Sequence, residues 1–274
     1  SSRNSATGPV AAHVFEAPGT YIVTMQAYDG VNTNATTTTI TVEDPNVVFS
    51  GTNTICVSSN TTPTAGANGC PSGAQTVMQA NFATAVNTYA LTNRRVLFKR
   101  GDTFSAPTSA AITSTGPGIL GAFGGGAAPK VEMTGDTAIL NLSSSATPNI
   151  KDWRIMDFEF DGLSKPNSFG ISLGGGFNQL TVLRINAHHI DMGITINGGV
   201  LDYINAWAST KHTLFEEIFI VESTFWRMYV FAKHLAILGG ALGNPLNDGA
   251  IGSLTHILRT PVIYKGVISN TTFS

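Results

Sequence analysis

The sequence WRIMDFEFDG, residues 153–162, alternates between apolar and acidic side chains. Its carboxylates stand at every second position, at Asp157, Glu159 and Asp161. Side chains two residues apart on a strand point to the same face. The pattern predicts a strand with an acidic outer face, and it predicts that three apolar side chains pack within the protein or against neighbouring strands: Ile155, Phe158 and Phe160.

From about residue 110 onward, short β-rich runs alternate with Gly, Asn, Ser and Pro. Five of these runs align on Ile155, Val182, Ile220, Ile237 and Val267, with steps of 27, 38, 17 and 30 residues. Irregular steps with a constant local pattern predict a solenoid whose coils vary in length and stack their aliphatic side chains. The step of 17 residues is short for a right-handed coil.

A β-sandwich or jelly roll also uses many short strands and is the alternative fold. It needs tight hairpin turns, and two-residue Asn-Gly or Asp-Gly turns between strands are scarce in this chain. The sequence therefore favours the solenoid.

Several motifs in order resemble the right-handed parallel β-helix of pectate-lyase-like proteins. They are an amphipathic segment from Met78 to Tyr89 that reads as a capping helix, then RRVLFKRGDTF (94–104), ILGAFG (119–124), DWRIMDFEFDG (152–162) and GVISNTTF (266–273). The resemblance implies an all-β fold, a right-handed parallel β-helix over residues 78–274 that is incomplete at its C-terminal end. Proteins with this fold commonly bind or cleave polysaccharides, many of them as lyases acting on uronic acid chains.

The first 45 residues form a separate unit. HVFEAPGTYIVTMQAYDG (13–30) and TTTTITV (36–42) resemble the C-terminal half of a PKD domain, an immunoglobulin-like β-sandwich module. Half a sandwich exposes its core, so upstream chain or a partner is expected to complete it. Residues 46–77 are expected to form a linker and a cysteine loop. The chain opens on a loop-like stretch without Met and ends within a predicted strand, so we expect both ends to be cut.

Charge and composition exclude several classes of function. Only 12% of the 274 residues are charged, and the formal net charge is −2. This balance gives no basis for binding nucleic acid or an anionic membrane. No stretch reaches the roughly 18 apolar residues of a membrane helix, so membrane insertion is not expected.

Two cysteines, Cys56 and Cys70, bracket a short polar loop. The alternatives are a disulfide bond and two free thiols in a reducing compartment; a zinc site lacks further ligands nearby. We predict the disulfide, because nothing else in the loop would hold it. A disulfide indicates an extracellular protein, either secreted or attached to the cell surface.

The three carboxylates are the first candidate site. Asp157, Glu159 and Asp161 are predicted to bind a cation such as Ca²⁺, which takes several oxygen ligands. The alternative is a hydrated strand face. Arg184 and Glu222 align with Asp157 in the next coils, and this column would bind a sugar acid or form a charge ladder between coils.

Two histidine-containing segments are the remaining candidates. In HHID (188–191), His189 is a candidate base oriented by Asp191, or part of a polar turn. In THILRTPVIYKG (255–266), His256, Arg259 and Lys265 are the residue types that β-elimination uses, unless they brace a loop. His234 would lie one coil earlier and contact substrate.

Two functions remain open. The first is a secreted protein that binds or cleaves an extracellular polysaccharide, as a lyase or a glycoside hydrolase. The second is a non-catalytic structural or adhesion protein or fibre subunit, with self-association or flanking modules completing the exposed edges. The first predicts that the charged residues of the aligned column line one surface; the second predicts no such clustering.

Overall fold

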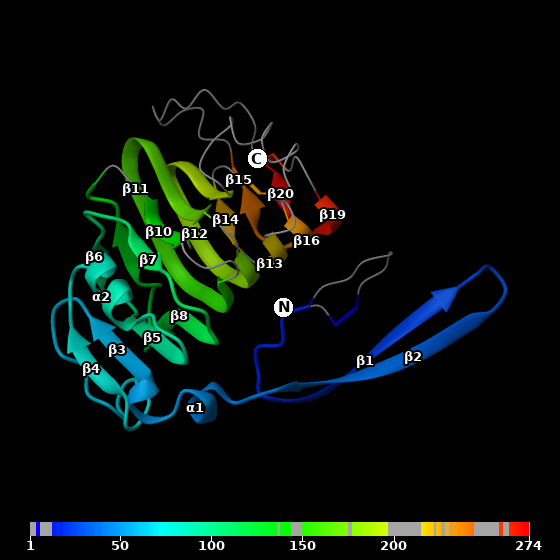
Figure 1. The fold of residues 1–274 in the computed structure, drawn as a ribbon, viewed down its shortest axis with the longest axis horizontal. Coiled ribbons are helices and arrows are strands. Elements are labelled where there is room, and N and C mark those ends of the chain that lie inside the picture. Colours follow the sequence, from blue (N-terminus) through cyan, green and yellow to red (C-terminus); the bar gives the residue numbers. More distant parts are fainter. Residues whose placement is uncertain are drawn as a thin grey trace.

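The chain folds into a parallel β-solenoid preceded by a separate β-hairpin (Figure 1). The computed structural model describes residues 4–5, 13–135, 138–143, 150–174, 177–196, 215–221, 223–225, 228–230, 232–243, 258–259 and 263–273. Within these residues, eighteen strands belong to the solenoid sheet and two to the hairpin. The predicted all-β solenoid is confirmed, and the jelly roll is excluded because the pairings within the large sheet are parallel.

The first coils contain the helices. The elements are α1 (Pro45–Val48), the 3-10 helix η1 (Gly51–Asn53), β3 (Thr54–Ser58), β4 (Gln75–Met78), α2 (Phe82–Tyr89), β5 (Arg94–Lys99) and β6 (Thr103–Ser105). β3 pairs in parallel with both β4 and β5. Solenoid pairing therefore begins at Thr54, inside the predicted linker, and Met78 belongs to a strand rather than to the predicted helix.

The middle coils carry the longest strands. They comprise β7 (Ala110–Ile112), β8 (Gly118–Phe123), β9 (Lys130–Glu132), β10 (Ala138–Ser143), β11 (Ile150–Gly174) and β12 (Phe177–Ile196). β11 pairs with β8, β9 and β10 on one side and with β12 on the other. The opening sequence thus lies at the centre of the solenoid.

The later coils use short strands. They are β13 (Phe215–Val221), β14 (Thr224–Phe225), β15 (Met228–Tyr229), β16 (Ala232–Leu238), β17 (Ala241–Leu242), β18 (Leu258–Arg259), β19 (Ile263–Ser269) and β20 (Thr272–Phe273). β13 pairs directly with β16, so the short 17-residue step is a real coil.

A column of aliphatic side chains runs through the solenoid. Its members lie opposite one another in consecutive strands and are at most 2% exposed: Ile55, Val96, Leu120, Ile155, Val182, Ile220 and Ile237. Four of the five predicted positions are confirmed. The fifth is displaced by one residue, because Ile237 lies opposite Ile268 and Val267 lies opposite Ala236.

Aromatic rings fill the core beside α2. Asn81 caps this helix by accepting a hydrogen bond from the Thr84 N–H, at 3.0 Å. The Phe82 ring lies 5.0 Å from that of Phe98 and 5.8 Å from that of Phe158. Centroid distances in this range are those of favourable aromatic pairs, so α2 is anchored to the core through Phe82.

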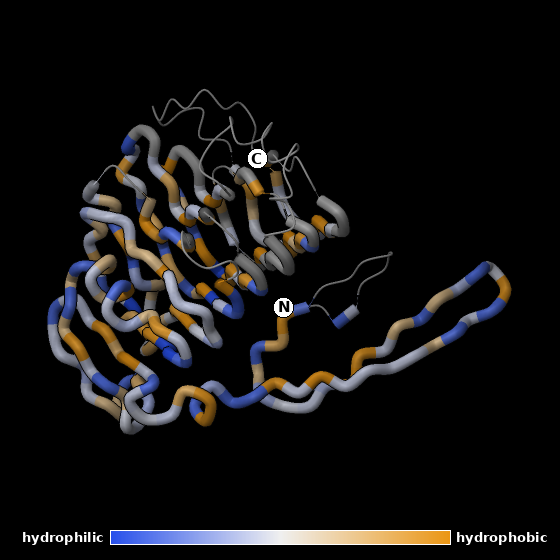
Figure 2. Tube along the Cα trace, in the orientation of Figure 1, coloured by the Kyte–Doolittle hydropathy of each residue, from blue (hydrophilic) through white to orange (hydrophobic). Residues whose placement is uncertain are grey.

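The N-terminal hairpin pairs β1 (Gly19–Tyr28) with β2 (Thr33–Val42) in antiparallel register. Figure 2 shows apolar and polar segments alternating along it. Ile22, Met25 and Tyr28 are each at least 65% exposed. Both strands lie within residues 1–45, and the described residues contribute no further strand to their sheet.

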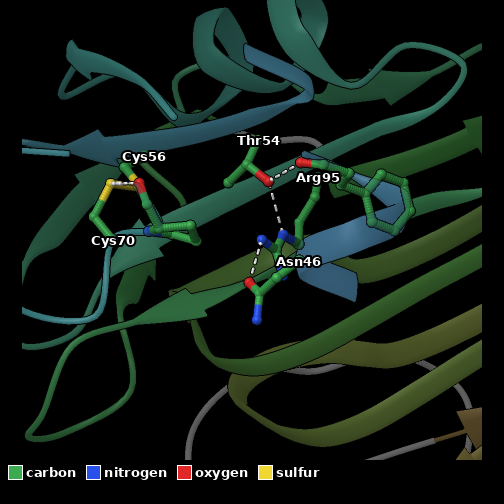
Figure 3. The surroundings of a disulfide bond; sticks show 7 residues. Asn46, Thr54, Cys56, Cys70 and Arg95 are labelled. Atoms are coloured by element: carbon green, nitrogen blue, oxygen red, sulfur yellow. Dashed lines mark hydrogen bonds between the residues drawn. A yellow bond between two sulfur atoms is a disulfide. The ribbon is translucent and has the colours of Figure 1, made fainter. Parts of the chain in front are cut away.

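The predicted disulfide between Cys56 and Cys70 is formed (Figure 3). Nearby, the buried Arg95 donates hydrogen bonds to the Thr54 hydroxyl and to the Asn46 side chain, each at 2.9 Å. Burial lowers the pKa of Arg95. These bonds tie β3 and β5 to the segment that joins the hairpin. In the described part of the chain, no helix is long and apolar enough to cross a bilayer.

Candidate functional site

Polar side chains gather where β9, β11 and β12 stack. Val131, Phe160 and Ala187 lie opposite one another in these strands and are fully buried. Because strand side chains alternate, the residues on either side of each point outward. Two outward columns result, one of Lys130, Glu159 and Asn186 and the other of Glu132, Asp161 and His188. With His189, the charged and imidazole side chains of these columns form what we call the Asp–His cluster: Lys130, Glu132, Glu159, Asp161, His188 and His189.

Asp161 is the centre of the Asp–His cluster and is 6% exposed. Its Oδ2 lies 3.0 Å from Lys130 Nζ, and its Oδ1 accepts a hydrogen bond from the Leu163 N–H, at 3.0 Å. Burial alone would raise the pKa of Asp161, but the Leu163 N–H and Lys130 outweigh burial and hold the pKa below its ordinary value. Asp161 is therefore a carboxylate at neutral pH. The same contact raises the pKa of Lys130.

Two adjacent histidines approach this carboxylate. His188 lies opposite Asp161 in the strand register, and His189 has φ of 50°, in the left-handed region. Adjacent residues of a regular strand face opposite sides. The left-handed residue breaks that alternation, and the two Nδ1 atoms lie 2.8 Å apart. His189 Nδ1 lies 3.2 Å from Asp161 Oδ1, and His188 Nδ1 lies 3.8 Å from the same oxygen.

Glu159 completes the Asp–His cluster from the neighbouring column. Its Oε1 lies 3.2 Å from His188 Nε2. The His188 ring is therefore contacted at both nitrogens, by Glu159 at one and by His189 at the other. A proton on Nε2 facing the Glu159 carboxylate leaves Nδ1 as the nitrogen with a lone pair.

Asp157 lies apart from the other two carboxylates. Its φ of 65° makes it a corner residue, and Arg184, opposite it in the next coil, has φ of 50°. Arg184 Nε and Nη2 lie 2.7 and 3.0 Å from the two Asp157 oxygens, and Arg100 adds a contact at 3.3 Å. Burial would raise the pKa of Asp157, but Arg184 and Arg100 hold it below its ordinary value.

The three predicted carboxylates thus divide between two sites. Glu159 and Asp161 share the Asp–His cluster, whereas Asp157 is held by arginines. The predicted alignment of Arg184 with Asp157 is found, and in this structure the two form a charge pair between coils. Arg184 also contacts Glu16, which comes from the segment preceding the hairpin.

The other predicted residues are not brought together by the described part of the chain. His234 lies on β16, with its backbone opposite Lys265 on β19. Arg259 lies on β18, opposite Tyr229. Glu222 and His256 lie outside the described residues, as do the side chains of Arg259, Lys265 and Asp191.

Sequence reasoning missed Lys130, Glu132 and Arg100. Lys130 is remote in sequence from Asp161 and Arg100 from Asp157, and only the coil register brings each pair together. Glu132 contacts Lys130, two residues away on the same strand. The signal was weak: KVE at residues 130–132 shows polar–apolar–polar alternation, but over a single strand of three residues. The sequence also paired His189 with Asp191 by strand parity, whereas the structure places His189 beside Asp161.

Two kinds of chemistry are open to this arrangement. Asp161, His188 and His189 present three ligand atoms within 4.8 Å of one another, which a metal ion can bridge. Carboxylates beside imidazoles can also exchange protons with a ligand or hydrogen-bond its hydroxyl groups.

A scan against models of protein families, a search of curated proteins and a search of solved structures each found no match to this chain. The PKD-like and pectate-lyase-like resemblances therefore rest on sequence motifs alone. The parallel β-solenoid rests on the structure itself.

Proposed function

We propose that this protein binds or cleaves an extracellular polysaccharide through the outer face of β9, β11 and β12. The observation that carries the proposal is the Asp–His cluster. It joins donors and acceptors from three coils on one outward face, with side chains such as Glu159 and His189 that are 31% and 45% exposed. Hydroxyl-rich ligands are recognised by such mixed sets of donors and acceptors.

The extended shape of the surface supports a polymer rather than a single sugar. Parallel strands stack about 4.8 Å apart, so equivalent outward positions of successive coils form a continuous row. Lys130, Glu159 and Asn186 are one such row. A polysaccharide running across the coils would meet one polar side chain at each step.

Cleavage has two routes. Glu159 and Asp161 are outward neighbours on one strand, about 6.5–7 Å apart along it, which suits the carboxylate pair of an inverting glycoside hydrolase. β-Elimination on a uronate polymer would instead use cations such as those predicted at Arg259 and Lys265. Of these two routes, hydrolysis is favoured, because the carboxylate pair lies within the described residues.

The test is a panel of neutral and uronate polysaccharides, with binding measured by affinity electrophoresis. Hydrolysis is read from new reducing ends, and elimination from the ultraviolet absorbance of unsaturated products. We expect binding that is weakened by Glu159→Gln and unchanged by Glu43→Gln, which alters an exposed glutamate after β2. Absence of binding and of product across the panel would refute the proposal.

The exposed hairpin favours a second function, that of a non-catalytic subunit of an extracellular assembly. Ile22, Met25 and Tyr28 are 65–73% exposed on a two-stranded sheet, and unpaired strand edges recruit further strands. Light scattering of the protein across a concentration series tests this. Association that Ile22→Thr with Met25→Thr abolishes would support it, and a monomer at every concentration would refute self-assembly.

A further inference from the structure

Three potential metal ligands converge in the Asp–His cluster. Asp161 Oδ1, His188 Nδ1 and His189 Nδ1 are separated by 2.8, 3.2 and 3.8 Å. The two imidazole rings are nearly perpendicular, with an interplanar angle of 82°. The atoms come from two coils that the β11–β12 register holds together, with Asp161 directly opposite His188.

The size of this triangle fits a small divalent ion. A triangle with these sides has a point about 2 Å from every corner, and zinc binds imidazole nitrogen and carboxylate oxygen at ~2.0–2.2 Å. An ion there would touch all three atoms without a change of backbone. The His189 side chain is 45% exposed, so water or a ligand can reach the remaining coordination positions.

Lone pairs on the three converging atoms also suit an ion. Asp161 Oδ1, His188 Nδ1 and His189 Nδ1 can each direct a lone pair toward one shared point, so a cation placed there attracts all three atoms at once.

The surroundings match those of a metal ligand set. Metal-binding histidines usually donate their other ring N–H to a carboxylate, which fixes the ring and raises its basicity. Glu159 is placed to do this for His188, at 3.2 Å from Nε2. Lys130 and the Leu163 N–H orient the Asp161 carboxylate in the same way.

The donor set selects the class of ion. Calcium and magnesium prefer oxygen ligands, and two of the three atoms here are imidazole nitrogens. Imidazole suits zinc, copper, iron and nickel. The Ca²⁺ site predicted from the three carboxylates would also need Asp157, which Arg184 and Arg100 hold.

We propose that Asp161, His188 and His189 bind one divalent transition-metal ion, with zinc as the reference ion. Three protein ligands leave at least one coordination position open to water or to a ligand. This site does not depend on the proposed polysaccharide function, because ion binding is measured in the absence of glycan and glycan binding can be measured with and without the ion.

The first experiment titrates Zn²⁺ into the chelator-treated, untagged protein by calorimetry, with Ca²⁺ as the comparison ion. We expect one Zn²⁺ per chain and no displacement by equimolar Ca²⁺. Cu²⁺ loaded into the wild-type protein should give an electron paramagnetic resonance spectrum with couplings from two nitrogens. A spectrum without nitrogen coupling, or no Zn²⁺ binding up to millimolar concentration, would overturn the proposal.

The second experiment uses variants. His188→Ala, Asp161→Asn and His189→Asn should each weaken Zn²⁺ binding by about tenfold or more, and Glu159→Gln by about tenfold through the outer contact. His189→Asn is chosen because asparagine tolerates the left-handed backbone. His13→Ala is the control and should bind normally, because the His13 ring instead contacts the Phe15 ring edge-on. Equal Zn²⁺ affinity in all variants would place the ion elsewhere and refute the site. If a variant fails to fold, the copper spectrum of the wild-type protein decides whether the two histidines bind the ion.

Discussion

Breaking the Cys56–Cys70 disulfide should loosen the first coil of the solenoid. The bond closes a loop with a sequence separation of 14 residues, which joins β3 to β4. Loop-closure entropy for a loop of this length stabilises the folded state by about 3 kcal/mol at 25 °C. Both half-cystines are almost fully buried, so replacing them also removes packing from a small cluster: Cys56, Cys70, Ala74, Leu97 and Phe123.

Two forms of the perturbation separate these contributions. Reduction with a thiol keeps both sulfur atoms and tests loop closure alone, with an expected loss of about 3 kcal/mol. The double variant Cys56→Ala with Cys70→Ala loses packing as well, by about 1 kcal/mol more. Urea unfolding of the oxidised, reduced and variant proteins at 25 °C measures the difference.

The loss should be local. In a solenoid each coil is stabilised chiefly by its neighbours, and among the described strands β4 pairs with β3 alone. Hydrogen exchange should therefore accelerate in Gln75–Met78 more than in residues 153–161. Oxidised and reduced proteins that unfold within about 0.5 kcal/mol of each other would refute the loop-closure reasoning. The loop would then be held by its own hydrogen bonds, such as the Gly66 N–H to the Cys70 carbonyl at 2.9 Å.

Three further outcomes are expected. Gly162→Ala would place a Cβ 2.2 Å from the His189 carbonyl oxygen, so it should lower the stability of the fold by about 1–3 kcal/mol or more and weaken Zn²⁺ binding. Gly125→Ala, whose Cβ would have no atom within 4 Å, should change neither quantity. Urea unfolding measures the stability and calorimetry the Zn²⁺ affinity. Phe82→Ala should destabilise the fold by about 3–5 kcal/mol in the same unfolding assay, because the ring is fully buried. Asp157→Asn should lower stability at neutral pH. Because folding lowers the pKa of Asp157, its contribution is present above the unfolded value of about 3.9 and is lost as the pH falls through the folded value, so the stability gap to wild type should close in acid.

The solenoid could be predicted from the sequence because its signal repeats. Ile155, Val182, Ile220 and Ile237 each stand in a similar local pattern, and stacking them requires only that coils be parallel. The first coil could not be found in this way. Thr54–Ser58 is a strand of five buried residues within a polar segment. Of its pairing partners, β4 follows the cysteine loop and β5 follows α2.

The Asp–His cluster could not be predicted from strand alternation, and the reason is physical. Alternation assigns Asp157, Glu159 and Asp161 to one face and His188 and His189 to opposite faces. Both assignments assume that every residue is extended, but Asp157, Arg184 and His189 adopt positive φ. Non-glycine residues rarely adopt positive φ. Here the turn at each corner of the coil imposes this backbone conformation, and the local sequence does not indicate it.

The same corners explain why the two sites are distinct and why they lie side by side in the chain. At the Asp157 corner the side chain leaves the acidic row and meets the arginine of the next coil, at 2.7 Å. Past that corner the strand resumes alternation, so Glu159 and Asp161 face outward together and present two carboxylates to His188. At the His189 corner the chain turns again. This turn places the His189 imidazole on the same side of the strand as that of His188, with the two Nδ1 atoms 2.8 Å apart. A straight strand would carry the same residues and could not bring two adjacent histidines to one carboxylate, so any ion or polymer that this face binds depends on the turns of the coil as much as on the side chains.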